Sequence, residues 1–145
     1  MSPATKREES TQARRLLIIE TAVKCFAEKG FHRTSMRDLA ERAGIGLGNV
    51  YNHFQGKADI IREIARLEAE ELQDFQADLS QITKPRKALD HFIRAYVSYC
   101  AERENALLAA EILSESLRNP EIGSGFLDNH AQLGQAVARI IDAIR

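Results

Sequence analysis

The chain has 145 residues, of which 44% are hydrophobic and 28% are charged. This length suits one domain, or a small domain joined to part of another, and the composition is too apolar for general disorder. No apolar run approaches the ~18 residues of a membrane-spanning helix and no signal peptide is evident, so we expect a cytoplasmic protein with no membrane partner.

The formal net charge is −1, but the charges are unevenly distributed along the chain. Residues 1–62 hold eleven Lys or Arg and seven Asp or Glu, whereas residues 63–145 hold nine and fourteen. A basic first part and an acidic second part are typical of a contact module fused to a different domain. The asymmetry is modest and does not by itself identify nucleic acid as a partner.

Almost every segment has helical periodicity, so we predict an all-α fold. After a polar start, residues 12–29 form the first predicted helix, and Gly30 ends it in the left-handed conformation. Ser35 and Asp38 then match a capping box, with Thr34 as an alternative cap, for a short second helix.

Glycines punctuate the next part of the sequence. Gly44 ends the second helix, and Gly46 can cap a third helix that runs to about Phe54. Further helices are predicted at 57–79, 85–103 and 105–118, and in a final pattern through Ile144. The separators between them are "SQITKP", the polar "ERENA" and a break at "RNPEIGSG". Because the final pattern reaches Arg145 without a terminating signal, we expect a C-terminal portion to be missing.

The remaining chemistry-bearing residues give little indication of catalysis. Cys25 and Cys100 each lie in an apolar helical pattern without metal-ligand spacing, so buried free thiols are predicted; redox sensing by Cys100 is a lesser alternative. His32, His91 and His130 do not cluster, so neither a metal site nor a cofactor is expected. No nucleophile–base pair or phosphate-binding glycine loop is present, so the chain is predicted not to be an enzyme.

Residues 35–54 fit the physical requirements of a helix-turn-helix, in which two short helices are joined by a tight turn that often contains glycine. Gly44 can adopt a positive φ angle without a clash at Cβ. Ile45 and Val50 can hold the second helix of the pair against the first. The opposite side of that helix carries Leu47, Gly48, Asn49, Tyr51, Asn52 and His53.

These residue types suit a DNA groove. Asn can pair with an adenine edge, Leu can contact a thymine methyl group, and Gly allows close approach of the backbone. Tyr51, His53 and Lys57 carry donors that could reach phosphate groups. The same helical spacing occurs in proteins that never contact DNA, so a helical protein-interaction module remains an alternative on spacing alone.

Two stretches, "LLIIETAVKCFAEKGFHRTSMRDLAERAG" and "VYNHFQGKADII", resemble the DNA-binding domain of the TetR (tetracycline-repressor-like) family of bacterial transcriptional regulators. The resemblance covers about residues 12–72. The features that match the family pattern are Phe26–Phe31, Thr34 and Ser35, Arg37–Ala40, and Tyr51–Lys57. Gly46 departs from the pattern, since the family commonly has Ser or Thr there and glycine offers no hydroxyl group.

The resemblance implies a three-helix DNA-binding head at residues 12–72, with the helix-turn-helix at about 35–54. The implied base-contacting residues are Arg37, Leu47, Gly48, Asn49 and Asn52. The implied phosphate-contacting residues are Thr34, Ser35, Tyr51, His53 and Lys57.

For residues 73–145 the resemblance implies a helical effector-binding and dimerisation domain, truncated in this chain. The candidate effector-pocket residues are Phe92, Tyr96, Tyr99, Cys100, Leu107, Glu111 and Ser114. A stripe of this kind is also how an ordinary helical core looks. The implied function is that of a repressor that a small-molecule effector releases from a pseudo-palindromic double-stranded DNA operator, with the complete protein acting as a homodimer.

Overall fold

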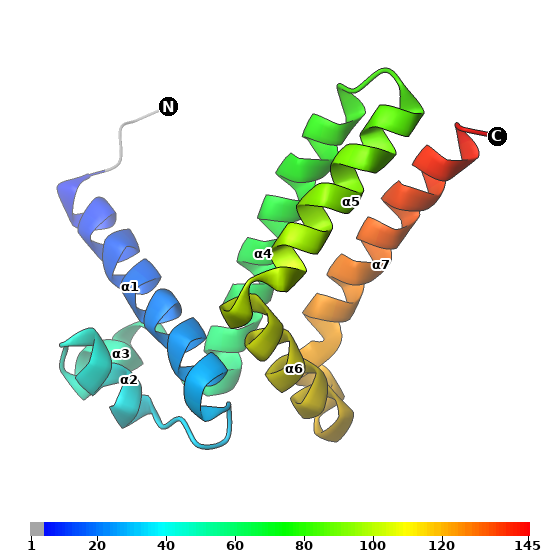
Figure 1. Ribbon diagram of the computed structural model, residues 1–145. Coiled ribbons are helices and arrows are strands. Elements are labelled where there is room, and N and C mark those ends of the chain that lie inside the picture. The colour runs from blue at the N-terminus through cyan, green and yellow to red at the C-terminus, as the bar shows by residue number, and fades with distance from the viewer. Residues whose placement is uncertain (1–4) are drawn as a thin grey trace. The chain divides into compact units, whose positions relative to one another are not determined.

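The computed structural model describes residues 5–145, and the regular structure within them is entirely α-helical (Figure 1), which confirms the predicted fold class. The helices of this range are α1 Lys6–Lys29, α2 Met36–Ala43, α3 Leu47–His53, α4 Lys57–Ser80, α5 Pro85–Ala101, α6 Arg103–Arg118 and α7 Pro120–Asp142.

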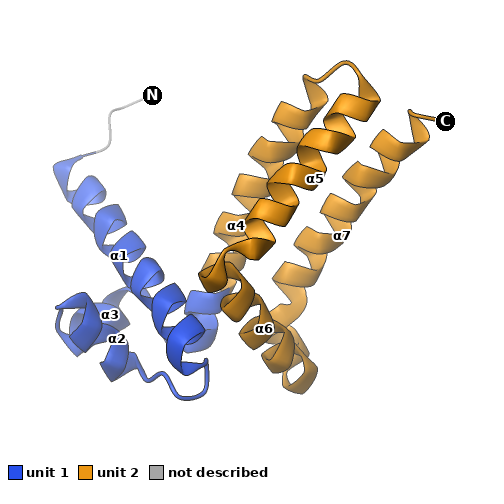
Figure 2. Ribbon diagram, viewed as in Figure 1, with its two compact units in different colours: residues 1–61 blue, residues 62–145 orange. Residues whose placement is uncertain are grey.

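The chain divides into two compact units, residues 1–61 and residues 62–145 (Figure 2). The first unit contains α1, α2, α3 and the first turn of α4, and the second contains the rest of α4 with α5, α6 and α7. This division and the domain boundary predicted between residues 72 and 73 both fall within α4. The domain limits themselves stay a prediction.

Helix α1 begins earlier than predicted, because a capping box lies upstream of residue 12. The Glu8 N–H donates to Thr5 Oγ1 and the Thr5 N–H donates to Glu8 Oε2, at 3.3 and 2.6 Å. The predicted polar start is therefore helical from Lys6; its residues 1–4 lie outside the described residues. At the other end, Gly30 has φ 91° and ψ 156°, so its φ is positive as predicted but its ψ lies outside the left-handed helical region. Only glycine adopts this backbone readily.

The predicted signals around α2 are confirmed. The Asp38 N–H donates to the Ser35 hydroxyl oxygen and the Ser35 N–H donates to an Asp38 carboxylate oxygen, at 3.0 and 2.8 Å. Gly44 ends α2 with φ 69° and ψ 32°, which is the left-handed conformation. Gly46 is the N-cap of α3 and has an extended backbone.

The core of the first unit draws apolar residues from every helix in it. The side chains with no exposed surface are those of Ile18, Ala22, Phe26, Leu39, Val50 and Ile60. Helix α3 has seven residues and buries only Val50 among them. A helix this short is not stable alone in water, so its packing on α2 must supply most of its stability.

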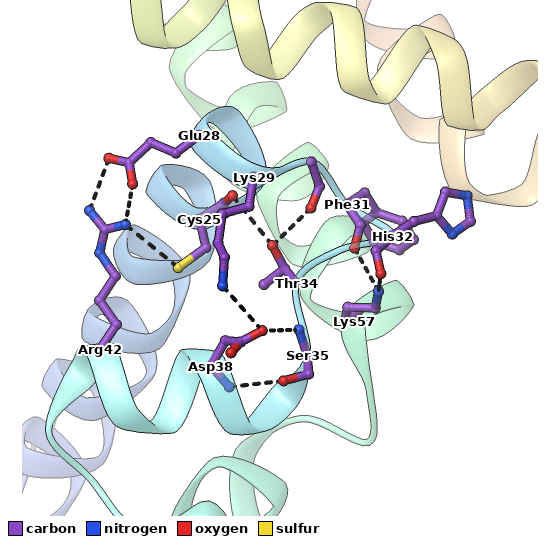
Figure 3. Close-up of polar contacts among 11 residues, drawn as sticks. Cys25, Glu28, Lys29, Phe31, His32, Thr34, Ser35, Asp38, Arg42 and Lys57 are labelled. Carbon is purple, nitrogen blue, oxygen red and sulfur yellow. Dashed lines mark hydrogen bonds and ion pairs between the residues drawn. The ribbon is translucent and has the colours of Figure 1, made fainter.

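Buried polar contacts shape the connection between α1 and α2 (Figure 3). The Thr34 hydroxyl oxygen lies 2.8 Å from the carbonyl oxygen of Gly30 and 3.3 Å from that of Cys25. Lys57 Nζ, at the start of α4, donates to the Phe31 carbonyl oxygen at 2.6 Å and lies 4.5 Å from the centre of the Phe31 ring. These contacts hold the connection from both sides.

In the second unit, the break predicted at "RNPEIGSG" is present but much shorter than predicted, because only Asn119 separates α6 from α7. Pro120 occupies the first turn of α7, where its missing N–H is not needed. Gly123 and Gly125 lie inside α7: a Cβ at 123 would overlap the Ser116 side chain, and one at 125 would lie 2.9 Å from the Cβ of Ala65. These glycines permit close helix packing. Similarly, Glu102 alone separates α5 from α6.

The two cysteines differ in exposure. Cys25 is buried, as predicted, but Cys100 is exposed, which corrects the second part of that prediction. The apolar pattern around Cys100 does not indicate burial, because several apolar side chains of α5 are exposed; Ile93 and Val97 are 50% and 58% exposed.

We predict that Gly44→Ala lowers the free energy of unfolding by about 1 kcal/mol, because a Cβ is strained at φ 69° even where nothing lies close to it. Chemical denaturation monitored by circular dichroism measures the change. The control is Gly48→Ala, inside α3 and without a positive φ angle, which should raise stability by about 0.5–1 kcal/mol. A Gly44→Ala protein as stable as the unaltered one would contradict the role given to Gly44.

We also predict that Thr34→Val, a change that keeps the shape of the side chain, lowers the free energy of unfolding by about 1–3 kcal/mol, because it removes a buried hydroxyl donor. The matched control is Thr11→Val on the exposed part of α1, where the Thr11 hydroxyl also donates to a backbone carbonyl oxygen. That change should stay within about 0.5 kcal/mol. Equal effects of the two substitutions would show that Thr34 has no special structural role.

Candidate nucleic-acid interface

The turn between α2 and α3 is compact. The Gly44 N–H donates to the Glu41 carbonyl oxygen at 3.2 Å, and the Ile45 N–H donates to the Ala40 carbonyl oxygen at 3.0 Å. These bonds satisfy the last carbonyl groups of α2 while Gly44 reverses the chain. Residues 44–46 thus join two short packed helices, which confirms the predicted helix-turn-helix.

The two sides of α3 have opposite character. Val50 is fully buried, whereas Gly48, Asn49, Tyr51 and Asn52 are exposed, with Tyr51 51% exposed. Within residues 5–145, no other residue hydrogen-bonds the side-chain amide of Asn49 or Asn52. Helix α3 is thus anchored by its buried side and exposes two amide groups on the other side. Their predicted contacts with bases stay predictions.

Three further residues predicted to contact DNA lie at the starts of α2 and α3. Arg37 is exposed, and its guanidinium group has no ion-pair or hydrogen-bond partner among the residues that the structure describes. Ser35 is exposed as well, and its hydroxyl oxygen already accepts the Asp38 N–H as the helix cap. Leu47, at the start of α3, is half-buried.

Thr34 requires a correction. It was predicted to contact phosphate, but it is only 1% exposed and its hydroxyl group is used by the backbone of α1 and Gly30. A phosphate group could reach this hydroxyl only if the α1–α2 connection opened. The role of Thr34 in the motif is therefore structural: its hydroxyl group holds the α1–α2 connection. Thr34 does not belong to the candidate interface.

Lys57 is half-buried and its ammonium group is engaged. It donates to the Phe31 carbonyl oxygen at 2.6 Å, lies 3.5 Å from the His32 carbonyl oxygen and sits over the Phe31 ring. These contacts fix the α1–α2 connection beside Ser35. The phosphate contact predicted for Lys57 stays a prediction. In this structure the contacts with Phe31 and His32 account for the position of the Lys57 ammonium group.

His53, the last residue of α3, is half-buried. Partial burial, followed by the positive charges of Arg15 and Arg14, holds the pKa of the His53 imidazole below its ordinary value. The ring is therefore neutral at pH 7, where the ordinary pKa of ~6.5 already favours the neutral form. A phosphate contact by His53 would then be an uncharged N–H hydrogen bond.

Helix α1 also takes part in this site, through a residue that the sequence motif does not include. Arg15 Nη1 donates to the His53 carbonyl oxygen at 2.9 Å, and its guanidinium carbon lies 4.4 Å from the centre of the Phe54 ring. A signal was present, because Arg15 lies three, four and seven residues before Ile18, Ile19 and Ala22 on the buried face of the helix. The charge drew attention away from that periodicity.

The candidate effector-pocket residues lie on two successive helices of the second unit, four on α5 and three on α6. The rings of Phe92 and Tyr96 stack with their centres 5.5 Å apart, and Phe75 of α4 lies 6.2 Å from Phe92. Tyr96, Tyr99, Cys100 and Leu107 are exposed, and Phe92, Glu111 and Ser114 are half-buried.

Carboxylates of α4 influence the exposed tyrosines of α5. Partial burial raises the pKa of Tyr99 to about 12, and the charges of Glu68 and Glu71 add to the effect. Glu68 is itself held by Asn129 of α7, whose Nδ2 donates to Glu68 Oε2 at 2.8 Å and to the Ala65 carbonyl oxygen at 3.0 Å. Asn129 is buried, and no motif or spacing in the sequence marks it as a functional residue.

Residues 5–145 contain neither a metal-ligand cluster nor a membrane-spanning helix. No group of three His, Cys, Asp or Glu side chains in this range could hold a metal ion. None of its helices is long and apolar enough to cross a membrane.

Comparisons with known proteins extend the resemblance. The HTH-type transcriptional regulator UidR of Escherichia coli strain K12 is 28% identical over 136 residues, which cover 91% of this chain and 66% of that protein. The HTH-type transcriptional repressor KstR2 of Rhodococcus jostii strain RHA1 is 37% identical over 67 residues, or 46% of this chain and 33% of that protein.

The fold is also shared with solved structures. The crystal structure of a Saccharomonospora viridis protein in complex with choline superposes with a TM-score of 0.78 at 26% identity, covering 90% of this chain and 69% of that one. The chain thus spans about two thirds of the length of the relatives that it matches from end to end.

Residues 18–64, which include the whole helix-turn-helix, match the family model described as bacterial regulatory proteins, tetR family. The UidR and KstR2 relatives are regulators, which confirms the prediction that the chain is not an enzyme. This match, which includes the buried Val50 and the Gly44 turn, shows that residues 18–64 form a DNA-binding domain of the tetR family type.

Proposed function

We propose that this chain is a DNA-binding transcriptional regulator of the cytoplasm and that α3 is its recognition helix. The observation that carries the proposal is the exposure of the Asn49 and Asn52 amides on a helix whose other side is fixed by fully buried Val50. An α-helix fits the major groove, and an Asn amide can pair there with the N6 and N7 atoms of adenine. Gly48 would let the backbone of α3 approach the bases closely.

The side chains around α3 support the same proposal. Arg37 offers an exposed guanidinium group, which can pair bidentately with guanine or with a phosphate group. Ser35 and Tyr51 carry exposed hydroxyl groups, and neutral His53 carries one N–H, so these residues would contact the DNA backbone and set the register of α3. Lys57 would act chiefly by holding the connection that presents Ser35.

We further propose that the complete protein is a homodimeric repressor. A regulator that reads one groove with one short helix gains specificity when two copies bind half-sites about 34–36 Å apart on a pseudo-palindromic operator. The Rhodococcus jostii relative is named a transcriptional repressor, and this supports repression rather than activation.

A small-molecule effector would control this repressor through the second unit. The Saccharomonospora viridis neighbour holds choline, which supports ligand binding by proteins of this fold. In this chain the aromatic residues Phe92, Tyr96 and Tyr99 would form the ligand-facing surface, with Cys100, Leu107, Glu111 and Ser114 around them. An effector can release DNA only if it binds the DNA-incompetent state more tightly.

The DNA-binding proposal is tested by selecting duplexes from a random library with the whole chain and measuring their affinity over a range of salt concentrations. We expect the affinity to fall steeply with salt, because phosphate neutralisation releases counterions. Asn49→Ala should lower the discrimination between the selected duplex and one base-substituted duplex by ~1–3 kcal/mol, since the amide no longer reads a base edge.

The control for Asn49→Ala is Gln132→Ala, which removes an exposed amide from α7 in the other unit and should change nothing. Binding that is weak, independent of salt and equal for all duplexes would overturn the proposal and favour the alternative, a helical protein-interaction module.

The effector proposal is tested by displacement of the selected duplex with choline and a panel of other small molecules. We expect at least one of them to weaken duplex binding by about 5–150-fold, the usual range of allosteric coupling. Tyr96→Ala should abolish this response and leave duplex affinity without ligand unchanged. Leu117→Ala, a change at an 80% exposed residue of α6, is the control. If no compound displaces DNA from a protein that binds it, the effector proposal fails and DNA binding stands.

A further inference from the structure

The carboxy-terminal end of α3 needs support from outside the helix. Helix α3 has seven residues, ends at His53 and is followed by Phe54 in an extended conformation. The last carbonyl groups of any helix lack partners within it, and two turns of helix are not stable alone. Asn52 lies in this last turn, so the direction of the turn decides where its amide points.

Arg15 supplies that support from α1, 38 residues away in the sequence. Its Nη1 donates to the His53 carbonyl oxygen at 2.9 Å, which satisfies one of the unpaired groups. A positive charge at this end of a helix also interacts favourably with the helix dipole. The same guanidinium group lies 4.4 Å above the ring of Phe54, which is only 2% exposed.

The base of the Arg15 side chain is itself held firmly. Arg15 is followed three and seven residues later by Ile18 and Ala22, which have no exposed surface and anchor the same face of α1 in the core. Phe54, on the other side of the contact, donates its N–H to the Val50 carbonyl oxygen at 3.0 Å. The contact therefore joins two rigid parts of the first unit across the end of α3.

We propose that Arg15 is a positioning residue for DNA recognition: without reading a base, it fixes the last turn of α3 through the His53 carbonyl group and the Phe54 ring and so aims Asn52. This inference rests on the proposed function of α3 as the recognition helix. It assigns specificity to a residue of α1, outside the helix-turn-helix.

Arg14 provides a matched control for Arg15. Both residues are half-buried arginines at the same level of α1, and both charges act on the His53 ring. Within the described part of the chain, however, Arg14 donates no hydrogen bond. Replacing either residue by Gln removes one positive charge near α3, but only Arg15→Gln removes the contact with its last turn.

The experiment compares Arg15→Gln, Arg14→Gln and the unaltered chain in two measurements. In the free protein, hydrogen exchange of the Phe54 amide should become about tenfold faster in Arg15→Gln and stay unchanged in Arg14→Gln. With DNA, Arg15→Gln should lower discrimination between the selected duplex and one substituted at the base pair read by Asn52 by about tenfold. Arg14→Gln should keep that discrimination, even if its loss of charge weakens binding to every duplex.

Arg15→Lys separates the contact from the charge. Lysine keeps the charge and one possible donor but lacks the planar group that stacks on a ring, so it should restore discrimination only in part. Because His53 senses both arginines, its pKa measured by NMR should rise in each Gln variant and serve as the check that both charges were near α3. If Arg15→Gln does not fold, Phe54→Leu replaces it, since this change keeps the burial and removes the ring face; it should lower discrimination in the same direction.

The outcomes distinguish this inference from the proposed function. If the unaltered chain selects no duplex, the proposed function fails and this inference falls with it. If the unaltered chain selects a duplex and Arg15→Gln discriminates as well as Arg14→Gln does, only the inference on Arg15 is overturned. Full rescue by Arg15→Lys would overturn the part of the inference that rests on the Phe54 ring, because a charge with a single donor would then be sufficient.

Discussion

The burial of a single valine governs the first unit of this protein. Helix α3 is too short to persist alone, and Val50 is the one residue of this helix that the core encloses completely. Residues one and two positions from Val50 lie about 100° and 200° away from it around the helix axis. With Val50 facing inward, Asn49 and Asn52 therefore lie outside the buried side of α3. The display of polar groups is therefore a consequence of packing, and Gly44 makes that packing possible by reversing the chain without a Cβ.

Two basic residues on either side of the helix-turn-helix stabilise its backbone through the same pair of contacts. Arg15 lies over the Phe54 ring and donates to a carbonyl oxygen at the end of α3, and Lys57 lies over the Phe31 ring and donates to a carbonyl oxygen between α1 and α2. In each case a cation contacts an aromatic face and the carbonyl group of a segment without regular hydrogen bonds. Basic side chains in this unit therefore do not by themselves identify a DNA-contacting surface, since two of them fix the backbone around the helix-turn-helix.

The sequence predicted those features that depend on local chemistry. The Ser35–Asp38 capping box, the Gly44 turn and the buried Val50 all follow from residue type and spacing, and all are present. The failures concern residues whose roles depend on a distant partner. Gly123 and Gly125 indicated a break, yet they lie inside α7 because Ser116 and Ala65 approach them closely. Thr34 matched the family motif but is hydrogen-bonded to the backbone of α1. None of these partners could be recognised without the fold.

The second unit holds α4 by directional bonds as well as by apolar packing. Asn129 of α7 donates to both the Ala65 carbonyl oxygen and the Glu68 carboxylate, and beside it Gly125 brings the two helices close together. A purely apolar contact can slide, but a buried amide that loses both acceptors is left unpaired, which is strongly unfavourable. The Asn129 amide therefore fixes the position of α7 along α4 at Ala65 and Glu68, which apolar packing alone would leave less well defined.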